Sequence, residues 1–136
     1  MTTLDPHTNL LRHTTEAMSA VLGGADSLSV APFDALFAEA NDFSSRLARN
    51  LSILLREESG LGQVQDPAAG SYYLETLTDQ LAQEAWTLFQ HTEAAGGLPA
   101  VRGRMLDSIK AVTTETFRRI ASGQQVVVGT NRFQNR

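Results

Sequence analysis

The stretch GGADSLSVAPFD, residues 23–34, is the one place in this sequence where the pattern changes from helix to strand and back. We expect Gly23 to take the left-handed conformation that ends a helix. In the run that follows, Leu28 and Val30 alternate with small residues, which predicts a short strand over residues 27–31. Pro32 suits the first position of a new helical turn. If the chain has a binding site, we expect it at the end of this strand.

Outward from this stretch, the apolar spacing predicts four main helices. Their apolar residues recur at intervals of three and four, as one buried face of a helix requires. The predicted helices cover residues 9–22, 43–58, 71–95 and 99–122. The pattern behind Pro32 also allows a short helix over residues 33–40.

Short polar side chains stand where three of these helices begin. Such side chains can accept hydrogen bonds from the free amides of the first turn. We therefore expect caps at Thr8 or Asn9, at Asn41 or Asp42, and at Ser71.

A second short apolar run, QVVVG at residues 125–129, predicts another strand. Helices that alternate with short apolar strands indicate an α/β fold with parallel strands. Two strands make a poor sheet by themselves. Either other strands come from elsewhere, or the chain folds as a helical bundle with minor strand content. We expect a single domain over residues 1–136, with a frayed polar tail over residues 130–136.

The composition excludes several classes of function. The chain has 136 residues, a formal net charge of -4 and no cysteine. The acidic balance argues against nucleic acid or an anionic membrane as a partner, and no apolar run approaches the roughly 18 residues of a membrane span. The lack of cysteine fits the cytoplasm or an organelle matrix. The first residues have neither the charged nor the apolar region of a signal peptide, so we expect a soluble intracellular domain.

The ionisable residues do not form a catalytic or metal-binding pattern. His7, His13 and His91 each lack a second ligand at a convincing spacing, so we expect no metal site. Asp26 and Asp34 flank the predicted strand and are the only carboxylates that share a location. Helix ends and solvated surfaces explain most carboxylates, and acid–base work by this pair would need shifted pKa values that a sequence does not reveal.

Several sequence blocks, in this order and spacing, resemble the methylmalonyl-CoA mutase family. The resemblance runs from about residue 5 to residue 134, nearly the whole chain. Its blocks are GGADSLSVAPFD at residues 23–34, RLARN at 46–50, EESG at 57–60, DPAAGSY at 66–72, GG at 96–97, ASG at 121–123 and VGTN at 128–131.

The resemblance implies a particular fold and reaction. In that family these blocks form the last part of an acyl-CoA-binding (β/α)8 barrel, the TIM barrel. This chain would then supply the last two or so β/α units of a partial barrel, with residues 27–30 and 126–128 as barrel strands. The family's reaction interconverts methylmalonyl-CoA and succinyl-CoA with adenosylcobalamin, which catalytic members hold in a separate domain.

Departures from the family pattern point away from catalysis by this chain. Catalytic members carry glutamine, histidine, asparagine and glutamate where this sequence has Asp26, Ser29, Ala31 and Ala35. Alanine can neither donate nor accept a side-chain hydrogen bond. The stretch looks more like the small, non-catalytic subunit of heterodimeric mutases. We therefore expect no catalytic residue, and the positions implied at the substrate-facing rim are Asp26, Ser27, Ser29 and Asp34.

The implied partner is the large catalytic mutase subunit, or the remainder of the barrel. Acyl-CoA would bind only in the complete enzyme, and no cofactor is expected on this chain alone. Two alternatives stay open. The chain is a fragment of a catalytic acyl-CoA mutase with altered specificity, or it is a free-standing helical domain that self-associates through exposed edges.

Overall fold

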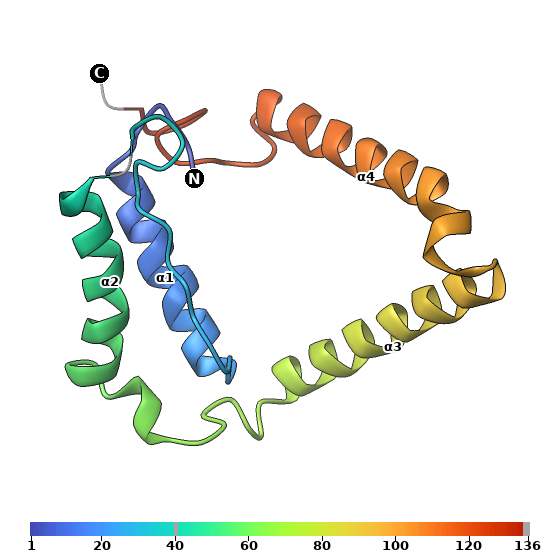
Figure 1. The fold of residues 1–136 in the computed structure, drawn as a ribbon, viewed down its shortest axis with the longest axis horizontal. Coiled ribbons are helices and arrows are strands. Elements are labelled where there is room, and N and C mark those ends of the chain that lie inside the picture. Colours follow the sequence, from blue (N-terminus) through green and yellow to red (C-terminus); the bar gives the residue numbers. More distant parts are fainter. Residues whose placement is uncertain (40, 135–136) are drawn as a thin grey trace. The chain divides into compact units, whose positions relative to one another are not determined.

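The computed structural model describes residues 1–39 and 41–134. These residues form four α-helices and one 3-10 helix (Figure 1). They divide into two compact units, one made of Met1–Ala68 with Val127–Arg136 and the other of Ala69–Val126. The elements are α1 at Thr8–Leu22, α2 at Asp42–Glu57, η1 at Leu61–Gln63, α3 at Tyr72–Ala94 and α4 at Gly97–Ala121.

All four predicted helices are present, and two of the three predicted caps are confirmed. Asn41 accepts a 2.9 Å hydrogen bond from the amide of Ser44 at the start of α2. Ser71 accepts a longer bond, 3.5 Å, from the amide of Leu74 at the start of α3. Each of these bonds satisfies an amide that has no partner inside its helix.

The predicted cap of α1 is wrong. Its N-cap is His7, which makes no capping hydrogen bond with its side chain. The side chain of Asn9 is bonded elsewhere, as described below. At the other end of α1, Gly23 has a φ of -82°, and the left-handed residue is Gly24, at 75°. The helix therefore ends where expected, but the chain reverses one residue later.

The two predicted strands are not formed. No β-strand occurs in residues 1–39 and 41–134, where the only β pairing is an isolated bridge between Val128 and Arg132. Residues 25–32 run back along α1 without regular structure (Figure 1). A strand needs a neighbouring strand to pair its amides and carbonyls, and the described chain supplies none. The observed architecture is a helix-rich partial domain, and a barrel is not confirmed.

The predicted short helix over residues 33–40 is only a turn in its described part. The carbonyl of Asp34 accepts hydrogen bonds from the amides of Phe37 and Ala38, and the pattern does not continue. Residue 40 lies outside the described residues. This turn leads into α2 and brings Asp34 close to the α2 cap.

The core of the first unit is small and partly polar. The buried face of α1 consists of Asn9, His13 and Ala17, spaced four residues apart. Among the apolar residues of this helix, Leu11 and Met18 are exposed, whereas Leu10, Val21 and Leu22 are half-buried. The most deeply buried positions of α1 therefore include two polar side chains, those of Asn9 and His13.

Aromatic rings tie the turn to both helices of this unit. Phe33 is buried, and its ring stacks on His7 at a centroid distance of 5.7 Å. It meets the edge of Phe43 at 6.5 Å. Pairs with these geometries stabilise a fold slightly beyond the area that they bury.

The C-terminal segment returns to the start of the chain within the same unit. The guanidinium of Arg12 donates a hydrogen bond to the carbonyl of Val128. Gly129 has a φ of 73° and lies directly against Asp5, so that a Cβ added there would be 2.6 Å from the Asp5 side chain. Both the backbone angle and the close approach require glycine at this position.

The frayed tail over residues 130–136 remains a prediction. The amides of Thr130 and Asn131 both donate to the carbonyl of Val127, which forms a turn at the start of this segment. Residues 135 and 136 lie outside the described residues. The single domain over residues 1–136 likewise remains a prediction beside the two compact units.

The second unit is a hairpin of α3 and α4. The two helices meet at a turn in which Gly96 and Gly97 have φ angles of 97° and 79°, and they diverge from that turn (Figure 1). Val101 is the only buried residue among the described residues of the two helices. None of the helices in the described part of the chain is both long and apolar enough to cross a membrane.

Candidate functional site

A groove lies between residues 28–32 and α2 in the first unit. Its volume is about 450 Å³, and the predicted rim residue Ser29 contributes to its wall. The segment 28–32 is held against the helix from one end, where Phe33 is buried and the turn at Asp34 joins the α2 cap. The full lining consists of Leu28, Ser29, Val30, Pro32, Ser45, Ala48, Arg49, Ser52 and Ile53.

The polar groups of this groove are hydroxyls and one guanidinium. Ser45, Arg49 and Ser52 are spaced by four and three residues along α2, which places them on one face of the helix. Ser29 faces them from the extended segment. Arg49 makes no ion pair within residues 1–39 and 41–134. Such a set can donate hydrogen bonds to an anionic or carbonyl oxygen.

The same groove lacks the side chains that acid–base or nucleophilic catalysis would need. Its lining contains no carboxylate, histidine or cysteine, so it has no general base and no activated nucleophile. The described residues also contain no cluster of three or more His, Cys, Asp or Glu side chains that could hold a metal ion. The arrangement can bind and position a polar group, but it has no residue to transform one.

Asp34 is withdrawn from this groove into the structure. Its residue is 9% exposed, and its carboxylate accepts a 2.8 Å hydrogen bond from the side-chain amide of Asn41. This bond lowers the pKa of Asp34, and burial opposes the shift. Because Asn41 also caps α2, Asp34 joins the turn after residue 32 to the start of that helix.

The other predicted rim residues are not gathered around a common point. Asp26 and Ser27 are exposed and do not line the groove, whereas Ser29 does. Ala31 and Ala35 are exposed as well. Of the four positions, the structure therefore places one in the groove, one in a part-buried hydrogen-bond pair and two on the open surface.

The sequence did not predict that one buried polar residue, Asn9, joins several segments of the first unit by hydrogen bonds. Asn9 is fully buried, and its amide donates to the carbonyls of Thr2, at 2.9 Å, and Phe33, at 3.0 Å. Its side-chain oxygen accepts from the Thr2 amide and from Arg12. No signal in the sequence separates this role from that of a cap. The face of Ser45, Arg49 and Ser52 could have been found from its spacing.

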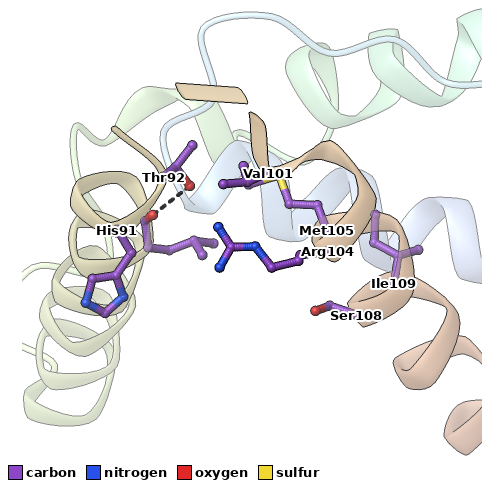
Figure 2. A pocket seen from close by; sticks show the side chains of 8 residues that line it. His91, Thr92, Val101, Arg104, Met105, Ser108 and Ile109 are labelled. Carbon is purple, nitrogen blue, oxygen red and sulfur yellow. Dashed lines mark hydrogen bonds between the residues drawn. The ribbon is translucent and has the colours of Figure 1, made fainter. Parts of the chain in front are cut away.

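A second cavity, of about 420 Å³, lies in the other unit where α3 and α4 meet (Figure 2). In Figure 2 the side chain of Arg104 points from α4 toward α3. The lining consists of Leu88, His91 and Thr92 from α3 and of Val101, Arg104, Met105, Ser108 and Ile109 from α4. Its wall is mostly apolar, and His91 and Arg104 are its only ionisable residues.

The fold and the groove define a helix-rich partial domain with a groove lined by hydroxyls and one guanidinium. Comparison with known proteins gives its family. A family model described as methylmalonyl-CoA mutase matches residues 1–136. The chain belongs to the methylmalonyl-CoA mutase family.

Individual relatives include subunits named as small. The chain is 43% identical to the methylmalonyl-CoA mutase small subunit of Porphyromonas gingivalis, over 98% of this chain and 22% of that subunit. It is 42% identical to the small subunit of Streptomyces virginiae, with the same two coverages. It is also 42% identical to a methylmalonyl-CoA mutase of Rhizobium meliloti, over 96% of this chain and 18% of the relative. The chain thus spans about a fifth of the length of these relatives.

Proposed function

We propose that this chain is a structural segment of a methylmalonyl-CoA mutase, of the small-subunit type, and that it does not catalyse the reaction itself. The observation that carries the proposal is that residues 31–35 offer few free polar side chains. Ala31 and Ala35 are exposed but offer no side-chain hydrogen bond, and Asp34 is engaged by Asn41. The similarity to subunits named as small supports the same role.

In the complete enzyme, we propose that the segment ends an acyl-CoA-binding barrel. Its partner would be the large mutase subunit or the rest of the barrel. Residues 27–30 and 126–128 would gain their strand partners there, which explains why neither run forms a strand alone. The groove lined by Ser29 and Arg49 would then lie beside the added strands and hold polar groups of that neighbour in place. A cytoplasmic or matrix location is part of this proposal.

The residues of this chain do not fit adenosylcobalamin. At the rim, the side chains that could donate to such a cofactor are limited to the hydroxyls of Ser27 and Ser29, because Ala31 and Ala35 carry no polar atom. Asp34, the retained carboxylate, is bonded to Asn41. We therefore assign the cofactor to the complete mutase and not to this chain.

Isothermal titration calorimetry of the full chain tests the non-catalytic part of the proposal. Adenosylcobalamin, methylmalonyl-CoA and free coenzyme A are titrated separately. We expect no saturable heat with any of the three. Tight binding of adenosylcobalamin would overturn the proposal, and binding of methylmalonyl-CoA would favour the alternative of a catalytic mutase with altered specificity.

A chimera tests the structural role. The matching segment of the Porphyromonas gingivalis small subunit is replaced by this chain, and the chimera is expressed together with the large subunit. We expect an assembled complex with mutase activity, because the segment needs only to fold and support its neighbours. A chimera that folds, judged by circular dichroism, but does not assemble would contradict the proposed role.

A further inference from the structure

The α3–α4 hairpin leaves its apolar residues open. On α3, Leu74, Leu77, Leu81 and Leu88 recur at helical spacing, and each of them is exposed. On α4, Ile109 and Val112 continue the row that starts at the buried Val101, and they are 60% and 67% exposed. A stripe of this kind on a surface helix normally faces another element. The stripes run well beyond the cavity of Figure 2, so a small ligand in that cavity would leave most of them uncovered.

The charges of the two helices are opposite. The α3 helix, Tyr72–Ala94, carries four acidic residues and no lysine or arginine. The α4 helix, Gly97–Ala121, carries five basic residues and two acidic ones. The basic residues of α4 are Arg102, Arg104, Lys110, Arg118 and Arg119.

These opposite charges are not matched inside the hairpin. In the described residues the ion pairs of α4 are internal to that helix, from Lys110 to Asp107 and from Arg118 to Glu115. No ion pair joins α3 to α4 in this part of the chain. Arg104 therefore brings a positive charge to a cavity whose lining contains no carboxylate.

We propose that a second copy of this chain covers the hairpin, with α3 of each copy packed against α4 of its partner. The helices have 23 and 25 residues, so their lengths match. A two-fold axis uses the same surface on both copies, and an acidic and a basic helix on one surface are complementary to themselves under that symmetry. The result is an antiparallel four-helix arrangement with apolar stripes inside and opposite charges at the flanks. This dimer proposal does not rest on the proposed function, because it concerns only contacts between copies of this chain.

Sedimentation equilibrium of the full chain is the first test. We expect a dimer that dissociates more readily at high salt, because salt screens the charges between the helices. Ile109→Asp, on the exposed stripe of α4, should abolish the dimer. Leu11→Asp is the matched control, since Leu11 is similarly exposed on α1 and should leave the dimer intact. Circular dichroism checks that both variants keep their helices.

Charge exchange between copies is the second test. Asp79→Lys with Glu84→Lys takes the net charge of α3 from -4 to zero, and Arg102→Glu with Arg104→Glu takes that of α4 from +3 to -1. Each double variant alone should raise the dissociation constant of the dimer at least ~tenfold, because the two-fold axis applies every reversed charge twice. In a mixed dimer one helix pair keeps its wild-type charges, and the other has the substituted charges exchanged on both helices. An equimolar mixture should therefore recover much of the affinity.

Three results would overturn the inference. They are a wild-type chain that stays monomeric, a dimer that is lost with Leu11→Asp but kept with Ile109→Asp, and a mixture of the charge variants that is no tighter than either alone. None of them bears on cofactor binding, so failure here and failure of the proposed function are distinguishable.

Discussion

The side chain of Asn41 joins two segments at once: its nitrogen donates to the carboxylate of Asp34 at 2.8 Å, and its oxygen accepts from the amide of Ser44 at 2.9 Å. One residue therefore caps α2 and fixes the turn that ends the stretch at residues 23–34. The geometry explains why Asp34 is held as a structural group. An aspartate could also cap the helix, but only an amide can do this and also donate to Asp34.

Comparing the two capping residues should show that Asn41 does more than cap a helix. Asn41→Ala removes both bonds and should lower the free energy of unfolding by about 1–2 kcal/mol, the upper part of the range for a lost cap. Ser71→Ala removes only the longer 3.5 Å cap of α3 and should cost less. Urea denaturation followed by circular dichroism measures both, and equal losses would contradict the double role of Asn41.

The stability of the first unit should depend on the ionisation of Asp34. The bond from Asn41 lowers the pKa of this carboxyl below its usual 3.8 in the folded chain. The ionised group therefore stabilises the fold fully above pH 3.8, and this contribution is lost as the pH falls through the lowered pKa. Asp34→Asn should be less stable than the wild type at neutral pH and should lose less on acidification.

The measurement is the urea midpoint from about pH 6 to about pH 3. Asp26→Asn is the control, because Asp26 is an exposed carboxylate on the same stretch. The urea midpoint of this variant should depend on pH in the same way as that of the wild type. A pH dependence that is the same for Asp34→Asn and for the wild type would show that the Asn41 bond does not stabilise the ionised form.

Asn9 should be among the costliest positions to truncate. Asn9→Ala leaves the carbonyl of Phe33 without its partner in a buried place, and the amide of Thr2 without its partner in a part-buried place. Such losses cost about 1–3 kcal/mol. Asn50→Ala, at an exposed asparagine of α2, should change the stability by less than about 0.5 kcal/mol. Thermal unfolding compares the pair, and a small effect at Asn9 would mean that its network is not formed in solution.

Gly129 and Gly24 allow backbone strain to be separated from steric overlap. Both have φ angles near 75°, but only Gly129 has a neighbour, Asp5, within 3 Å of an added Cβ. Gly24→Ala should cost about 1–2 kcal/mol from the left-handed conformation alone. Gly129→Ala should cost more and should also raise amide exchange in residues 127–132. Equal losses in the two variants would show that the C-terminal segment does not rest on Asp5.

The sequence predicted the helices well because each depends on local signals. Spacing of apolar residues located α1 to α4 within a few residues, and the polar residues Asn41 and Ser71 marked two of their starts. The strands failed for a physical reason. The residues at 27–31 and 125–129 have strand-like patterns, but pairing depends on a neighbour that this chain does not contain in its described part.

The candidate site was predicted only in part, because its geometry is set by contacts between distant residues. Ser29 lies in the wall of a groove, while Asp34 is bonded to Asn41. That these residues belong to a substrate-facing rim remains a prediction. Nothing local to Asp34 reveals that partner. Likewise, Leu28 and Val30 were predicted to form one face of a strand because they alternate with small residues. That local pattern does not show that Arg49 lines the same groove.

The uneven placement of basic residues on α3 and α4 also determines how trypsin would cut the chain. Trypsin cleaves after lysine and arginine, and neither occurs between Arg56 and Arg102. All of α3, including Trp86, would therefore leave a complete digest inside one large acidic peptide, whereas α4 would be divided at five places. If copies of the chain cover these helices in solution, brief digestion should spare the sites on α4, so a mass spectrum would report the contact directly.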